Sequence, residues 1–90
     1  MQARADTGNG RALIFRALGD RTRLRIVEIL LKGERCACKL PSLVGKAQPT
    51  VSLQLKKLVA AGVLSFRKEG AKSIYRVSNP NVAKLLEAAG

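Results

Sequence analysis

Apolar residues recur at helical spacing through most of the chain and switch to strict alternation only in its last third. Over residues 21–32, apolar residues cover most of the expected helix surface, and polar residues form a single stripe along it. This pattern predicts a central helix covered by others, with Asp20 as its N-cap and Gly33 closing it. A shorter apolar pattern predicts a helix over residues 11–18. Residues 1–10 are polar and contain two glycines, so we expect a flexible N-terminal arm there.

Two apolar segments in the middle of the chain predict a pair of helices. Residues 40–44 form the first, and a second begins at Gln48, interpreted as a weak cap, with Pro49 at its first helical position. Gly62 ends this second helix. Because residues 45–48 provide only a short link, the pair is a helix-turn-helix candidate.

Alternating side chains after Gly62 predict a β-hairpin. Leu64 and Phe66 alternate with polar residues, as do Tyr75 and Val77, and a polar turn containing Gly70 lies between the two runs.

Asn79 and Pro80 then predict the start of a last short helix that runs through Ala89. The predicted fold is mainly α with a β-hairpin wing, a winged helix-turn-helix. It forms one domain over residues 11–90, preceded by the arm at 1–10.

Charge narrows the choice of partner. The chain has 17 Lys and Arg against 6 Asp and Glu, a formal net charge of +11, which favours a polyanion such as nucleic acid. An anionic membrane is the alternative. However, no apolar run approaches the roughly 18 residues of a membrane span, and residues 1–10 lack the apolar stretch of a signal peptide. We therefore expect a cytoplasmic protein without a membrane partner, in which thiols stay reduced. With no histidine and scattered acids, an enzyme site is not indicated.

The outer face of the predicted second helix fits the major groove of DNA. It carries amide, hydroxyl, apolar and cationic side chains, and no carboxylate occurs between residues 48 and 67. These residue types contact bases and phosphates, and a basic hairpin next to such a helix is typical of a wing. A solvated helix face is the alternative. An RNA-binding module is disfavoured because the few aromatics lie at core or hairpin positions. The predicted DNA contacts are Gln48, Thr50, Ser52, Leu53, Gln54, Lys56 and Lys57 in the helix and Arg67, Lys68 and Lys72 in the hairpin.

The stretches FRALGDRTRLRIVEILL and QPTVSLQLKKLVAAGVLSFRKEGAKSIYRVS resemble the ArsR/SmtB family of winged-helix metalloregulatory repressors. The resemblance covers most of residues 11–89 and includes the recognition-helix pattern from Gln48 to Leu58. It implies a homodimer that binds an inverted-repeat operator in double-stranded DNA and releases it when an inducer binds. Gln54 stands where the family often has His. The Cys-x-Cys of arsenic-responsive members is matched by Cys36 and Cys38, but Pro41 replaces their third cysteine.

Cys36 and Cys38 are the candidate inducer ligands. Pro41 disfavours helical geometry at Leu40, so we expect an extended or loosely turned segment that presents both sulfurs together. Arg35, Lys39 and a nearby helix N-terminus favour the thiolate form.

Two thiolates could chelate arsenite or antimonite, with water or a small thiol as the third ligand. Lead, cadmium or bismuth would need Glu34 or a second subunit as an additional ligand.

Three alternatives stay open from sequence: the cysteines are small buried core residues, they form a thiol-redox switch, or the protein is a constitutive or architectural DNA-binding regulator.

Overall fold

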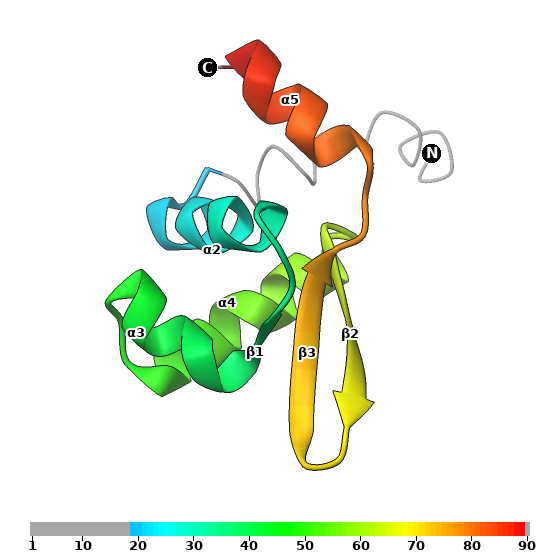
Figure 1. The fold of residues 1–90 in the computed structure, drawn as a ribbon. Helices are drawn as coiled ribbons and strands as arrows, with labels where there is room; N and C mark the ends of the chain where they lie inside the picture. Colours follow the sequence, from blue (N-terminus) through cyan, green and yellow to red (C-terminus); the bar gives the residue numbers. More distant parts are fainter. Residues whose placement is uncertain (1–18, 90) are drawn as a thin grey trace, which may run out of the picture.

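The structure is a computed structural model that describes residues 19–89 and arranges them as helices packed beside an antiparallel hairpin (Figure 1). The predicted arm at residues 1–10 and the predicted helix at 11–18 lie outside the described residues. In chain order the elements are α2 (Arg21–Leu31), β1 (Arg35–Cys36), the 3-10 turn η1 (Ala37–Lys39), α3 (Leu40–Val44), α4 (Gln48–Ala60), β2 (Leu64–Glu69), β3 (Lys72–Val77) and α5 (Asn81–Ala89).

Side-chain caps mark the start of α2 and α5 but not of α3 and α4. Asp20 accepts a hydrogen bond of 3.1 Å from the backbone N–H of Arg23, which confirms it as the N-cap of α2. The side chain of Asn79 accepts one of 2.9 Å from the N–H of Asn81 at the start of α5. The prediction that Gln48 caps α4 is wrong. Ala47 occupies the N-cap position without a side-chain bond, and Gln48 is already helical.

The expectation of non-helical geometry at Leu40 is also wrong. Leu40 has φ −68° and ψ −39°, and it begins α3 with Pro41 in the first turn, where the missing N–H needs no helical partner. The restriction on the residue before proline is overcome because η1 leads directly into α3. The backbone N–H of Leu40 donates to the carbonyl of Ala37 and fixes the turn.

The sheet has three antiparallel strands in the order β1-β3-β2. The hairpin strands are longer than predicted, because Glu69 pairs with Lys72 and leaves only Gly70 and Ala71 in the turn. Gly70 has φ +63°, a conformation that glycine adopts without strain. The sequence did not predict β1, which pairs Arg35 with Tyr75 and Cys36 with Ile74.

One core joins α2, α3, α4, the start of β2 and the first turn of α5. This core supports α4 on its buried side, while the hairpin extends away from the helices (Figure 1). Within residues 19–89, none of the helices has the length and apolar character needed to cross a bilayer. The buried apolar residues are Ile26, Val27, Ile29, Leu30, Leu40, Val51, Leu55, Leu58, Val63, Leu64 and Val82.

Candidate functional site

Helix α4 has one buried and one open face, and most of the predicted DNA contacts lie on the open one. Val51, Leu55 and Leu58 anchor the helix in the core with at most 2% of their surface exposed. Leu53, by contrast, is 51% exposed. The exposed predicted contacts on α4 are Gln48, Thr50, Ser52, Leu53, Lys56 and Lys57.

Gln54 differs from the other predicted contacts on α4. Its side chain is partly buried, and its Oε1 atom is buried with no hydrogen-bond partner among the described residues. A buried amide oxygen that lacks a donor carries a free-energy cost. Gln54 therefore lies at the margin of the open face, as the helical period of the sequence predicted.

The predicted DNA-contacting cations of the hairpin differ in whether they form ion pairs. Lys68 and Lys72 are exposed and appear in no ion pair of the described residues. Arg67 is instead engaged by two carboxylates. Its Nη1 and Nη2 donate to the two oxygens of Glu34 at 3.0 and 2.6 Å, and its Nε donates to Glu69 at 2.8 Å. The hydrogen bond from Arg67 lowers the pKa of Glu34.

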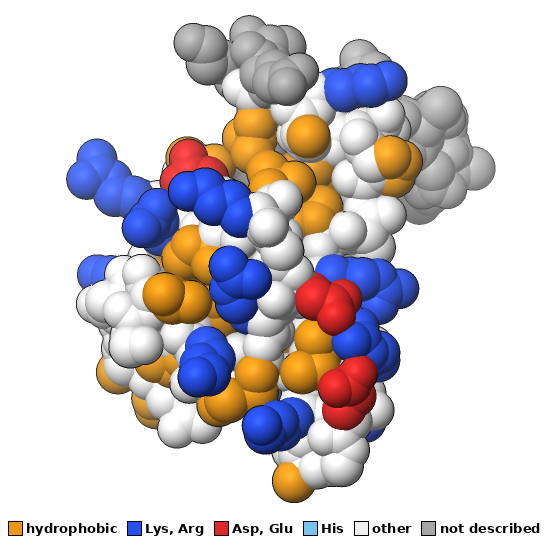
Figure 2. Space-filling view, in the orientation of Figure 1, with side chains coloured by type: hydrophobic (Ala, Val, Ile, Leu, Met, Phe, Trp, Pro, Cys, Tyr) orange, Lys and Arg blue, Asp and Glu red, His pale blue; other side chains and the backbone are white. Residues whose placement is uncertain are grey.

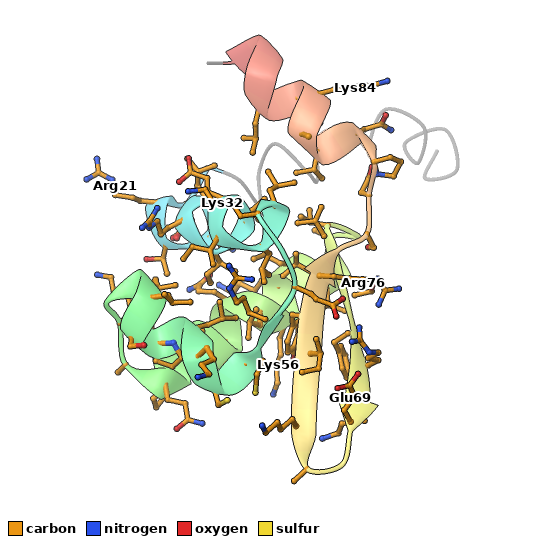
Figure 3. The ribbon with its side chains drawn as sticks, viewed as in Figure 1. Arg21, Lys32, Lys56, Glu69, Arg76 and Lys84 are labelled. Atoms are coloured by element: carbon orange, nitrogen blue, oxygen red, sulfur yellow. The ribbon has the colours of Figure 1, made fainter. Side chains whose placement is uncertain are left out.

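The surface around these elements is strongly cationic. Figure 2 shows blue Lys and Arg side chains both over the helices and along the hairpin, with the red carboxylates in isolated spots. Figure 3 shows Glu69 and Arg76 on the hairpin and Lys56 extending from α4. A surface of this sign attracts phosphate groups.

The two cysteines have different backbones but lie close together. Cys36 ends β1 in an extended conformation, with φ −65° and ψ 140°, whereas Cys38 lies inside η1. The segment expected to be extended or loosely turned is thus extended at Cys36 and forms a single turn at Cys38. The turn nevertheless brings the backbone N–H of Cys38 within 3.3 Å of the Cys36 sulfur, to which it donates a hydrogen bond.

This contact makes the thiols chemically unequal. Hydrogen bonds from the Cys38 thiol and backbone N–H lower the pKa of Cys36, with help from the positive charges of Lys72 and Lys39. The same thiol contact raises the pKa of Cys38, because its proton is shared with the Cys36 sulfur. Lys39 lowers the pKa of Cys36, as predicted from the sequence. Lys72 was not predicted to act here, and Arg35 instead donates to the backbone oxygen of Glu34.

A pocket of about 210 Å³ opens beside both cysteines. One wall is the cysteine segment, another is the N-terminal half of α4, and the third is the turn of the hairpin. This pocket therefore joins the candidate inducer ligands to both candidate DNA-contacting elements. Its lining residues are Cys36, Ala37, Cys38, Pro41, Gln48, Val51, Ser52, Leu55, Ala71, Lys72 and Ser73.

The two cysteine sulfurs suit a ligand that binds two thiolates. They do not suit a metal ion that needs all of its ligands from the protein. No group of three or more His, Cys, Asp or Glu side chains that could hold a metal ion occurs in the described part of the chain. Both oxygens of Glu34, the carboxylate considered as an extra ligand, are bound to Arg67. A tetrahedral four-ligand zinc site is not formed by these residues.

Comparison with known proteins is consistent with the fold. The model of the family described as "Bacterial regulatory protein, arsR family" matches residues 20–65. A probable mercury resistance operon repressor of Streptomyces lividans is 42% identical over 78 residues, which are 87% of this chain and 62% of that protein. An arsenical resistance operon repressor of Staphylococcus xylosus is 38% identical over 66 residues, 73% of this chain and 64% of that protein. The chain thus spans less than two thirds of either relative.

A solved structure agrees over almost the whole chain. The homodimeric winged helix-turn-helix DNA-binding domain Mb0332 of Mycobacterium bovis, a possible ArsR-family regulator, is 28% identical and superimposes with a TM-score of 0.87. The match covers 99% of this chain and 82% of that one. With its fold, its open α4 face and these relatives, the chain belongs to the ArsR family of bacterial regulatory proteins and has the winged helix-turn-helix fold.

Proposed function

We propose that the protein is a homodimeric transcriptional repressor that binds an inverted-repeat operator and releases it when arsenite or antimonite binds at Cys36 and Cys38. The observation that carries this proposal is the pocket in which both cysteines, the start of α4 and the hairpin turn meet. Resistance-operon repressors for mercury and arsenicals among the relatives support an inducer of this chemical class.

DNA binding is assigned to α4 and the hairpin. Thr50, Ser52 and Leu53 on the open face of α4 would contact base edges in the major groove, and Lys56 and Lys57 would hold phosphates. Lys68 and Lys72 would hold flanking backbone from the wing. In a two-fold symmetric dimer, two copies of α4 would enter successive major grooves about 34 Å apart.

The inducer is assigned to the two sulfurs. Trivalent arsenic and antimony are soft and bind thiolates, and the third ligand would be water or a small thiol. Cys36 would bind first because its thiolate forms more readily, and Cys38 would follow. Each bond to sulfur would replace a hydroxyl group of arsenous or antimonous acid, and that hydroxyl would leave as water with the proton of the thiol. Cadmium, lead or bismuth would require a further ligand from a second subunit, because Glu34 is bound to Arg67.

Release of DNA would act through the shared pocket. A ligand on both sulfurs would occupy space next to Ser52 of α4 and Lys72 of the hairpin. Cys36 also pairs with Ile74 of β3, so a shift of its backbone would move the wing. The proposed mechanism therefore changes the position of the wing relative to α4. A coupling free energy of about 1–3 kcal/mol would weaken operator binding by about 5- to 150-fold.

The test is fluorescence anisotropy of a labelled inverted-repeat fragment from the promoter of its own operon, titrated with arsenite under reducing conditions. We expect arsenite to weaken the affinity of the wild type for DNA by about 5- to 150-fold. Cys36→Ser/Cys38→Ser should bind DNA equally well and ignore arsenite. The chain has no other cysteine, so the response of the wild type is assigned without ambiguity. An unchanged response in the double variant would refute the assignment.

A thiol-redox switch is the second candidate, favoured by the turn that holds the backbone N–H of Cys38 within 3.3 Å of the Cys36 sulfur and so keeps the two cysteines together. Oxidation to a Cys36–Cys38 disulfide by a diamide-type oxidant would then release DNA while arsenite would not. The same anisotropy assay with both reagents separates the two candidates.

A further inference from the structure

A second recess of about 310 Å³ lies between the start of α2 and the link from α3 to α4. Arg21, Thr22 and Arg25 line it from α2, Val44 from the end of α3, and Lys46 from the link. Two segments that are distant in the sequence thus bring three cations and one hydroxyl around a small apolar patch. None of these residues belongs to the predicted DNA-reading face.

The charge in this recess is not neutralised within the described residues. No carboxylate lines it, and Arg21 and Lys46 take part in no ion pair of residues 19–89. Arg25 has Glu28 at 3.9 Å, but both side chains are at least half exposed, and such pairs are weak. Asp20 is nearby along the chain, but it accepts the backbone N–H of Arg23 as the helix cap. The recess therefore presents a net positive charge to any anion that enters.

The recess lies near the start of α4, because Lys46, which lines it, precedes the first residue of α4 by two positions. Lys57 of α4 lies close enough to Asp20 at the start of α2 to contribute to the lowering of its pKa, after the hydrogen bond from Arg23. In Figure 1 the start of α2 and the end of α3 lie on one side of α4, and the hairpin lies on the other. Figure 3 shows Arg21 at the end of α2 that is remote from Glu69 on the hairpin.

We infer that this recess binds a DNA backbone phosphate next to the segment contacted by α4, on the side opposite to the wing. The inference rests on the proposed DNA-binding function and adds residues to it. Arginine guanidinium groups match phosphate oxygens bidentately, Lys46 adds a point charge, and the Thr22 hydroxyl can donate to a phosphate oxygen. The contact would fix the register of the protein on the duplex without reading its sequence.

The experiment measures binding to labelled duplexes across a series of salt concentrations. It uses an inverted-repeat promoter fragment and a non-specific duplex of equal length, because phosphate contacts form on both. The test variant is Arg25→Gln/Lys46→Gln. The control is Lys84→Gln, which removes one positive charge from the exposed face of α5. Arg25 and Lys46 are exposed, so both replacements leave the core intact.

Loss of one phosphate contact should reduce the slope of log K against log salt by about 0.9 in the double variant. We expect this reduction on both duplexes, with Lys84→Gln close to the wild type. A slope equal to that of Lys84→Gln would overturn the inference. The inference would also be overturned if inorganic phosphate shifted the NMR signals of the recess in the wild type while the variants kept the wild-type slope on DNA. If the wild type bound neither duplex, the proposed function itself would fail, an outcome distinct from both.

Discussion

At the scale of single residues, Cys36 and Cys38 differ although only Ala37 separates them. The Cys36 sulfur receives hydrogen bonds from the thiol and the backbone of Cys38 and faces the charges of Lys72 and Lys39. Cys38 donates its proton and has a raised pKa. Because the deprotonated form of a thiol is the nucleophile, the two residues should react at different pH values.

We predict that iodoacetamide modifies Cys36 with a pH midpoint below that of an ordinary cysteine, and Cys38 with a midpoint above it. Peptide mass spectrometry after timed labelling measures both rates in one sample. Lys72→Gln should raise the midpoint of Cys36, because a charge that stabilises its thiolate is removed. Cys36→Ser should lower the midpoint of Cys38, because the sulfur that holds its proton is gone. Equal rates at both thiols across the pH range would contradict this assignment.

At the scale of elements, α4 divides into a structural side and a contacting side. Leu58 is fully buried in the core, and Leu53 is half exposed on the opposite side of the same helix. Both are leucines on α4, so the same substitution separates packing from recognition. Side chains in the core contribute to stability through packing, and exposed ones contribute little.

Leu58→Ala should lower the free energy of unfolding by about 2–5 kcal/mol, because it leaves a cavity in the core. Leu53→Ala should change it by less than about 0.5 kcal/mol and weaken operator binding instead. Urea unfolding and anisotropy measure the two effects on the same preparations. The division would be wrong if Leu53→Ala destabilised the fold as much as Leu58→Ala, or if it left DNA binding unchanged.

At the scale of the whole molecule, the cysteine segment is connected to the wing by two independent contacts. Strand β1 pairs Cys36 with Ile74 of β3, and Glu34 binds Arg67 of β2. Arg67 thus has two roles that compete, because a guanidinium held by Glu34 is less available to a DNA phosphate. The ion pair is solvent-exposed, so its effect should concern function more than stability.

Glu34→Gln should weaken the connection between the cysteines and the wing. We predict tighter DNA binding, because Arg67 is released from a carboxylate, and a smaller arsenite-induced loss of affinity than in the wild type. Glu69→Gln is the matched control, since it removes the other carboxylate partner of Arg67 within the hairpin and leaves Glu34 in place. Anisotropy with and without arsenite measures both variants. Identical arsenite responses in the two variants would rule out the connection through Glu34.

Local patterns in the sequence determined most of the elements. The N-cap at Asp20, the proline in the first turn of α4 and the alternation in the hairpin are short-range signals, because capping, backbone restriction and side-chain period act over a few residues. The open face of α4 followed from the helical period, which places Leu53 opposite the core. The cationic character of the molecule followed from composition alone.

Tertiary structure alone decided how distant segments meet. Strand β1 has two residues, too few for a period, and exists only because β3 supplies its hydrogen-bond partner. Glu34 and Arg67 are 33 positions apart, and no local signal pairs them. Lys72 reaches the cysteines, and two recesses form, only once the helices pack beside the hairpin. Local rules determine the elements, but contacts between elements depend on packing, and the candidate site is made of such contacts.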